Sequence, residues 1–332
     1  MTDIRFDVLT IGNAIVDVFA HTEEDFLVRE GLAKGSMILT SEERAEHLRG
    51  AMREAVEISG GSAANTVVGV ASLGGRGAYF GKVKDDAGGA VFTRDLRAQG
   101  IHYETAPLRE GPSTAKSFIF ITPDGERTMN TYLGATHRLG PEDIDPAVVR
   151  ASAITYMEGY LWDPRDAKDA FLKAAAIAHA AGRRVAITLS DPFCVDRFRG
   201  EFLDLIRSGV VDTLFANEHE LRSLYETSDL QTGIDLVRRD ARLTVVTRSE
   251  AGAIAVEGEV ETSVPAFPID RLVDTTGAGD LFAAGFLFGL SRDMPHLASL
   301  KLGALAAAEV IQHVGARPQA DLRSLAERHG LL

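Results

Sequence analysis

The sequence predicts an α/β protein with a mostly parallel central sheet. Short apolar runs recur along the 332 residues, stretches with helical spacing separate them, and no internal repeat or low-complexity linker interrupts them. Strands that alternate with helices pair in parallel, and such sheets bind ligands beyond the carboxyl ends of their strands. One main domain is therefore expected rather than two.

The first expected strand is DVLTIG, a buried apolar run that ends at Gly12. Further apolar runs predict strands over 78–83, 152–157, 184–189, 213–217 and 243–247. Helical periodicity predicts helices over 90–100, 165–182 and 230–240.

One segment departs from this alternation. In STAKSFIFITPDGERTMNTYLGA (113–135), two β-prone runs flank Pro123, Asp124 and Gly125. Proline presets φ, aspartate can bond to its own backbone and glycine accepts a positive φ, so the segment predicts a β-hairpin. This hairpin is either a surface decoration or part of a lid over a substrate.

Composition and charge exclude several classes of protein. The net charge of −13 argues against a nucleic-acid binder, which normally presents a basic face. The single cysteine, Cys194, cannot form an internal disulfide, which fits a reducing compartment. No signal-peptide pattern opens the sequence, and no apolar run approaches the length of a membrane span. We expect a soluble, cytoplasmic protein that binds neither nucleic acid nor membrane.

Two glycine-rich segments precede apolar helices. In ISGGSAANTVVGVASLGG (58–75), Gly60 and Gly61 permit a tight turn before a helix over 63–73. In DTTGAGDLFAAGF (274–286), a buried helix is expected to begin near Gly279, after a strand that ends over 272–276.

Glycines at such a helix start let an anion approach N–H groups that have no helical partner, and the helix dipole favours negative charge. Each segment alone could instead be a tight structural turn, with Asp280 as an ordinary helix cap. The chain has no G-x-x-x-x-G-K-[ST] motif, and no G-x-G-x-x-G follows the first strand. Neither a P-loop NTPase nor a standard dinucleotide-binding fold is therefore expected.

Together the two segments resemble the signatures of the ribokinase-like (PfkB) carbohydrate and nucleoside kinases. Other segments follow in the order of that family: GNAIVD (12–17), GKVKDDAGG (81–89), NEHE (217–220), VTRSEAG (246–252) and GARP (315–318). The resemblance covers the whole chain. It implies that 1–332 form one kinase domain, a ribokinase-like three-layer α/β sandwich with a small β lid built from about 15–50 and 102–138.

The resemblance also implies the catalytic centre. Gly277, Ala278 and Gly279 would form an anion hole for the phosphoryl group in transfer, and Asp280 would orient the acceptor hydroxyl and accept its proton. Because a helix N-terminus favours the charged carboxylate, we expect Asp280 to be a weak base. The transition state of phosphoryl transfer is loose, so positioning and charge neutralisation contribute most of the rate.

ATP and Mg²⁺ are implied as cosubstrate and cofactor. Asn217 and Glu220 match the family's N-x-x-E, which suits a hydrated Mg²⁺ near the triphosphate, although alone it could be a solvated acidic helix start. Thr247 and Gly252 lie in the turn that approaches the ATP phosphates, where Arg248–Ser249 replaces the glycine-containing pair of ribokinases.

Two further features of the family are open in this chain. Arg127, after the hairpin turn, could reach a phosphate or be an exposed strand arginine. Many relatives also bind K⁺ beside the anion hole, and Asp274 and Thr276 match one side of that site. Carbonyls near Val310 and Gly315 would form the other side, but Gln319 stands near the usual serine.

The acceptor motifs resemble those of adenosine kinases more than those of ribokinases. Asn13 and Asp17 from GNAIVD, with Gly61, Ser62 and Asn65 from GGSAAN, correspond to ribose contacts. A carboxylate and an amide suit a vicinal diol, since each hydroxyl donates one hydrogen bond and accepts others.

A purine pocket is implied by four residues. Tyr160 and Phe193 would lie against the base, and Leu133 and Ala135 would close over it from the lid. For any single aromatic residue, core packing is the commoner role, and Trp162 has no clear counterpart in the family.

The sequence therefore predicts an ATP-dependent nucleoside kinase that transfers the γ-phosphate to the 5′-hydroxyl, with adenosine as the expected acceptor. The alternatives are a sugar kinase of the same family, acting on ribose, fructose or a keto-deoxy sugar acid, and a catalytically silent nucleoside sensor. Intact Asp280 and N-x-x-E argue against the sensor. A monomer and a homodimer are both compatible with a lid hairpin.

Overall fold

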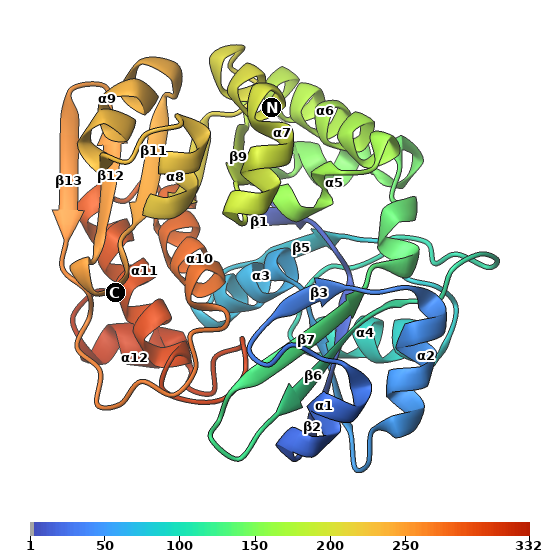
Figure 1. The fold of residues 1–332 in the computed structure, drawn as a ribbon. Coiled ribbons are helices and arrows are strands. Elements are labelled where there is room, and N and C mark those ends of the chain that lie inside the picture. Colours follow the sequence, from blue (N-terminus) through green and yellow to red (C-terminus); the bar gives the residue numbers. More distant parts are fainter. Residues whose placement is uncertain (1–2) are drawn as a thin grey trace.

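An eight-stranded sheet runs through the centre of the protein, which the computed structural model describes over residues 3–332 (Figure 1). The strand order is β13-β12-β11-β10-β9-β8-β1-β5. All pairs from β11 to β5 are parallel, and β12 and β13 are antiparallel to their neighbours, so the prediction of a mostly parallel sheet is confirmed. The strands are β1 (Phe6–Ile11), β5 (Gly77–Phe80), β8 (Ser152–Glu158), β9 (Arg184–Thr188), β10 (Thr213–Asn217), β11 (Leu243–Thr247), β12 (Ala253–Glu257) and β13 (Val260–Val264).

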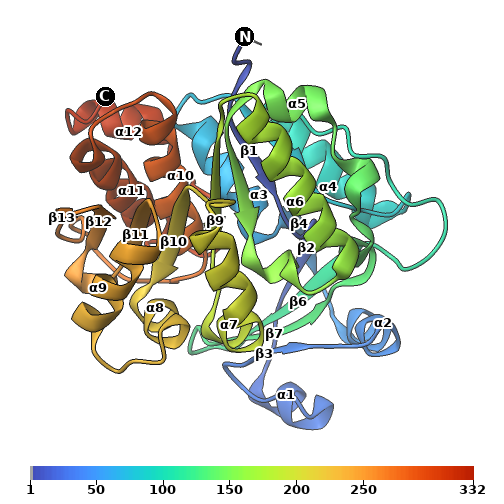
Figure 2. The same cartoon turned by 90° about the horizontal axis from the view of Figure 1, so that it is seen from above.

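Helices cover both faces of this sheet and complete the three layers (Figure 2). One face packs against α3 (Ser62–Ser72), α10 (Ala278–Ser291), α11 (His296–Val310) and α12 (Leu322–Arg328). The other packs against α5 (Pro146–Arg150), α6 (Arg165–Ala180), α7 (Pro192–Arg207), α8 (Glu218–Leu224) and α9 (Leu230–Asp240). Short 3₁₀ turns are η1 (Gly134–Arg138), η2 (Pro141–Asp143), η3 (Gly159–Trp162) and η4 (Ser249–Ala251). Within residues 3–332, no helix has the length and apolar character needed to cross a bilayer.

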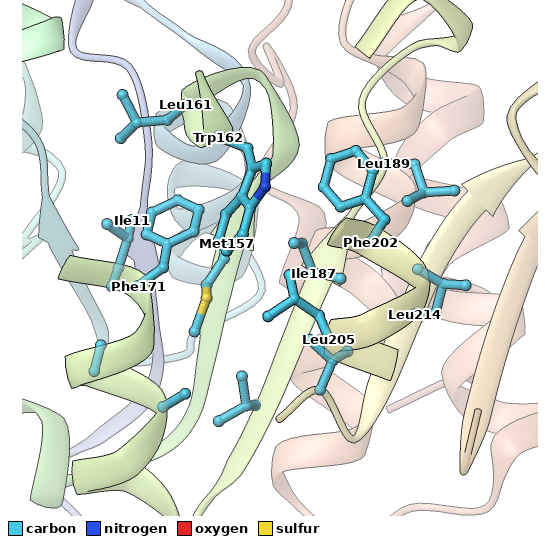
Figure 3. Packing of buried hydrophobic residues seen from close by; sticks show 14 of the residues in the cluster. Ile11, Met157, Leu161, Trp162, Phe171, Ile187, Leu189, Phe202, Leu205 and Leu214 are labelled. Carbon is cyan, nitrogen blue, oxygen red and sulfur yellow. The ribbon is translucent and has the colours of Figure 1, made fainter. Parts of the chain in front are cut away.

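The alternation of side chains along the strands separates two cores. Ile11 and Met157 face the α6 and α7 layer, whereas Val8 and Ile154 on the same strands face α10 and α11. Figure 3 shows the first core, where Trp162 packs beside Phe171 and Phe202. The Trp162 indole donates to Glu201 Oε2 at 3.0 Å, so this residue has a structural role.

A second sheet of five strands, in the order β3-β7-β6-β2-β4, lies beside the first (Figure 1). It consists of β2 (Ile15–His21), β3 (Met37–Leu39), β4 (Val56–Gly60), β6 (Ala115–Ile121) and β7 (Arg127–Tyr132), flanked by α1 (Glu24–Glu30), α2 (Glu42–Ala51) and α4 (Ala87–Ala98). The hairpin prediction is confirmed, because β6 and β7 pair antiparallel around Gly125, whose φ is +86°. Strand β4 also belongs to this sheet, although it lies outside the two ranges expected from sequence.

The strand expected to end over 272–276 is absent, so that prediction is wrong. A strand needs a neighbour for its hydrogen bonds, and β13 pairs only with β12. The N–H groups of Val273 and Asp274 instead both bond to the carbonyl of Ile311, at the end of α11. The segment before α10 is therefore an irregular connection held by a helix end.

Phe202→Ala should lower the free energy of unfolding by about 3–5 kcal/mol, because it opens a cavity beside Trp162 in a fully buried cluster. Chemical denaturation measures the change. Leu172→Ala is the control, since Leu172 is 43% exposed and its truncation should cost far less. Equal losses in the two variants would contradict the assignment of this core.

Candidate active site

A cavity of about 340 Å³ opens at the carboxyl ends of the central strands, beside the start of α10. Several residues expected from sequence share its wall: Ser62, Tyr160, Asn217, Glu220, Thr247, Thr276, Gly277, Gly279 and Asp280. The rest of the wall was not anticipated and consists of Tyr156, Thr188, Ser190, Phe215, Ala216, Phe282 and Ala283. The cavity thus brings the two glycine-rich segments and the N-x-x-E motif to one place.

The turn before α10 presents two unpaired N–H groups. Gly277 caps the helix with φ +82°, and a Cβ there would lie 2.7 Å from the Ala316 Cα, so only glycine fits. The N–H groups of Gly277 and Gly279 have no hydrogen-bond partner among the described residues, whereas that of Ala278 donates to the Thr275 carbonyl at 3.2 Å. Two of the three N–H groups expected in the anion hole are therefore free for a ligand. A Cβ on Gly279 would meet open space, which leaves room for an anion.

Asp280 lies in the first turn of α10 and is held by two side chains from α3. The Ser62 hydroxyl donates to Oδ1 at 2.6 Å, and the Asn65 amide donates to Oδ2 at 3.0 Å. Burial raises the pKa of Asp280, and these two hydrogen bonds lower it in part. Desolvation therefore acts against the helix dipole, which favours the charged form and from which a weak base was expected.

In the five-stranded sheet, Asp17 of β2 presents a carboxylate that makes no hydrogen bond within residues 3–332. It faces Gly60, where a Cβ would come within 2.1 Å of Oδ2. Burial raises the pKa of Asp17 to about 7, while Arg317 and Arg127 lower it in part and Asp280 raises it. The backbone of Gly61 beside Asp17 has φ +94°, a conformation that favours glycine.

A carboxylate that the sequence patterns did not indicate connects Asn13, after β1, to the start of α3. Glu158, at the end of β8, accepts hydrogen bonds from Asn13 Nδ2 at 2.7 Å and from Ala63 N at 2.8 Å. It is buried, and burial raises its pKa to about 7 despite these bonds. Asn13 Oδ1 is buried without a partner among the described residues. Glu158 therefore fixes Asn13 while leaving one acceptor atom available.

Asn217 and Glu220 form a capping box at the start of α8. The Asn217 backbone N and Nδ2 donate to the two Glu220 oxygens, and Asn217 Oδ1 caps the helix. Burial raises the pKa of Glu220 to about 7, and Asp191 adds to the rise. No basic side chain in the described chain pairs with Glu220.

A buried carboxylate without a cationic partner, on a cavity wall, fits a hydrated Mg²⁺. Among residues 3–332 no group of three or more His, Cys, Asp or Glu side chains could hold a metal, so the ion would depend on water and ATP oxygens.

Thr247 reaches the cavity but Gly252 does not line it. A Cβ on Gly252, with φ +85°, would lie 2.0 Å from the Val264 carbonyl. Glycine is therefore required at position 252 because the turn between β11 and β12 packs against β13. Contact with a nucleotide is not needed to explain it.

The residues proposed for K⁺ do not fit that ion in this structure. Asp274 Oδ2 accepts from Arg127 Nη1 at 2.8 Å and from Gly315 N at 2.9 Å, and Oδ1 accepts from Thr276. Both charged side chains are buried, with 10% of Arg127 and 7% of Asp274 exposed. Arg127 of strand β7 thus already neutralises the carboxylate that would bind the cation. Arg127 is consequently not an exposed strand arginine. One of its donors, Nη2, is buried without a hydrogen-bond partner among the described residues.

The expected purine pocket is only partly assembled here. Tyr160 lines the cavity, together with Tyr156 and Phe215. Phe193, in contrast, is 63% exposed at the start of α7 and stacks under Arg197, outside the cavity wall. Leu133 and Ala135 also lie outside that wall, and Ala135 is buried in η1.

Comparison with known proteins places these features in context. A family model described as "pfkB family carbohydrate kinase" matches residues 27–322. The structure of an adenosine kinase from Sinorhizobium meliloti is 55% identical, with a TM-score of 0.91 over 98% of this chain and 99% of that one. A probable sugar kinase from Rhizobium etli is 52% identical, with a TM-score of 0.93 over 99% and 100%. An ATP-dependent ribose-1-phosphate kinase from Halopiger xanaduensis is 33% identical over 71% of this chain and 74% of its own.

Arg127→Met should lower the free energy of unfolding by about 3–5 kcal/mol, because it leaves Asp274 buried without its cation. The double variant Arg127→Met with Asp274→Asn should lose less than the sum of the single changes. Chemical denaturation of the four proteins measures this coupling. Arg197→Met is the control, since the Arg197–Asp163 pair is exposed and should contribute less than about 1 kcal/mol.

The same pair predicts the response to cations. Replacing NaCl by KCl at equal ionic strength should leave the Tm of the wild-type protein unchanged, because Asp274 is already neutralised. A rise in Tm specific to K⁺ would show that the ion displaces Arg127, contrary to this assignment.

Proposed function

The chain belongs to the PfkB family of carbohydrate kinases, phosphotransferases with a hydroxyl acceptor, and we propose that it is an ATP-dependent nucleoside kinase with adenosine as acceptor. The observation that carries the proposal is the environment of Asp280. This residue directly follows the turn with two unpaired glycine N–H groups and accepts hydrogen bonds from the Ser62 and Asn65 side chains, in the cavity that Glu220 also lines.

The proposed reaction follows from these positions. Asp280 accepts the proton of the acceptor hydroxyl as that oxygen bonds to the γ-phosphorus, and the bond from this phosphorus to the β,γ-bridging oxygen breaks to release ADP. The N–H groups of Gly277 and Gly279 donate to the oxygens of the phosphoryl group in transfer. Mg²⁺ near Asn217 and Glu220 would neutralise charge on the phosphates.

The raised pKa of Asp280 suits this role. A carboxylate with an ordinary pKa holds a proton too weakly to assist a hydroxyl, whereas burial brings its basicity closer to working pH. The two hydrogen bonds from α3 keep the group ionised and aim it. Both effects come from the protein and need no movement of Asp280.

Two observations favour a nucleoside over a free sugar. The cavity wall includes Tyr160, which is 37% exposed, and an aromatic side chain suits a base. The adenosine kinase from S. meliloti also shares 55% of its residues with this chain over nearly the whole length.

A sugar kinase is the second candidate, supported by the similarity to the R. etli and H. xanaduensis proteins. The protein would act in the cytoplasm, as its one buried cysteine suggests. It would act there as a monomer or homodimer.

ADP release from ATP and Mg²⁺ should be fastest with adenosine in a panel of nucleosides and free sugars, and Asp280→Asn should lower kcat by at least about 100-fold, because the amide accepts no proton. Direct binding of adenosine by the variant is the control for folding. Turnover restricted to free sugars would exclude the nucleoside acceptor. Tight adenosine binding without turnover by the wild-type protein would indicate a sensor.

Ser62→Ala should move the acidic limb of the pH profile of kcat/KM to higher pH. The Ser62 hydroxyl donates to the ionised carboxylate of Asp280 and so lowers its pKa, and removing this donor raises the pKa. Activity requires the ionised base, so it is lost as pH falls through that pKa. Ser190→Ala is the control, because Ser190 shares the cavity wall but does not contact Asp280. An unchanged limb in Ser62→Ala would exclude Asp280 as the group that titrates.

A further inference from the structure

Arg317 lies in the loop after α11 and places a guanidinium group near Asp17. Its Nε donates to Asn65 Oδ1 at 3.3 Å, and Asn65 in turn donates to Asp280. Because the guanidinium has only donors, it orients the Asn65 amide with its oxygen toward Arg317 and its nitrogen toward Asp280. The Nε of Arg317 is therefore occupied by a hydrogen bond within the protein.

The loop that carries Arg317 is anchored on the anion-hole side. The Gly315 N–H donates to Asp274 Oδ2 at 2.9 Å, and Ala316 packs against Gly277 so closely that no Cβ fits there. The position of the guanidinium is consequently set before any ligand binds, which reduces the entropy lost on binding.

The other edge of Arg317 is unused. Its Nη2 is buried and has no hydrogen-bond partner among residues 3–332, and burial lowers the pKa of the group. A buried donor left unpaired costs about 1–3 kcal/mol, so a structure that retains one has a reason for it. Asp17, whose carboxylate also lacks hydrogen bonds, is the charged group that acts most strongly on Arg317.

We propose that Arg317 is a specificity-determining residue of the acceptor site, donating from Nη to the oxygen of an acceptor hydroxyl whose proton Asp17 accepts. A hydroxyl both donates and accepts, so a carboxylate and a guanidinium side by side satisfy both of its functions. The inference rests on the proposed function and adds to it a second group that recognises the hydroxyls. Nucleosides that lack the hydroxyl would leave two charged groups unpaired, which penalises them strongly.

The neighbours of Arg317 indicate the hydroxyl end of the acceptor rather than the phosphoryl group. Asp17, Asp95 and Tyr79 are the groups that act electrostatically on Arg317, and Asp280 is not among them. Arg317 therefore acts most strongly on Asp17, and among the described residues it is linked to Asp280 only through Asn65.

The test compares wild-type protein and Arg317→Gln on adenosine, 2′-deoxyadenosine and 3′-deoxyadenosine. On adenosine the variant should lose about 10- to 100-fold in kcat/KM, mostly through KM, the size expected for a hydrogen bond to a charged donor. On the one deoxynucleoside that lacks the contacted hydroxyl, the loss should shrink to about 3-fold or less. Arg317→Lys keeps the charge without the planar fork and should be intermediate.

Equal losses on all three nucleosides, or no loss at all, would overturn the proposal and leave Arg317 as a support for Asn65. The proposal would also be overturned if the wild-type protein preferred a phosphorylated ribose to adenosine and only Arg317→Gln removed this preference. Arg317 would then bind an anion. Arg97→Gln is the matched control: Arg97 is partly exposed, donates to the Tyr103 carbonyl and lies on α4, so its loss should not change the ratio between substrates.

Failure of the proposed function is visible separately. If the wild-type protein phosphorylates ribose but no nucleoside, the same comparison is made with ribose and 2-deoxyribose. The role of Arg317 is then supported or overturned by the same ratio, whichever acceptor is used. Thermal unfolding of each variant identifies any that fail to fold, and Arg317→Lys then replaces Arg317→Gln in the comparison.

Discussion

The close packing of α3 on α10 is the constraint on which the site depends. A Cβ on Gly69 would lie 2.6 Å from the Ala284 Cβ, so the two helices meet where α3 has no side chain. This contact lets their first turns converge, and Ser62 and Asn65 then reach Asp280. The N-terminus of α10, with its unpaired N–H groups, consequently faces the cavity that Ser62 of α3 also lines, and the helix dipole favours an anionic ligand there.

Burial opposes the effect of the helix dipole and has the larger influence on the pKa of the carboxyl groups. A helix dipole contributes about 0.3–1 kcal/mol near the surface and rarely more than about 2 kcal/mol, whereas desolvation can move a pKa by several units. Asp280 accordingly has a raised pKa, as do Asp17 and Glu158 nearby. The site thus combines carboxylates of raised pKa with unpaired N–H groups at the start of α10.

Local patterns in the sequence suffice for the individual strands of the central sheet and for the hairpin, because strand-forming runs and turn residues are recognised from neighbours within a few residues. They fail over 272–276, where a strand requires a partner that β13 does not provide. They also leave out Glu158, whose partner Asn13 is 145 residues away, and the pairing of Arg127 with Asp274. Such contacts are properties of the fold, and no spacing along the chain indicates them.

The Arg127–Asp274 pair connects strand β7 of the five-stranded sheet to the turn before α10. One carboxylate accepts hydrogen bonds from lid strand β7, from the loop at Gly315 and from Thr276 at the turn itself. That loop also carries Arg317, which bonds to Asn65. Any displacement of the lid therefore moves or unpairs Asp274, and through it the residues that shape the hole. Since phosphoryl transfer depends mainly on positioning, this pair matters because it links strand β7 to the turn that precedes Asp280.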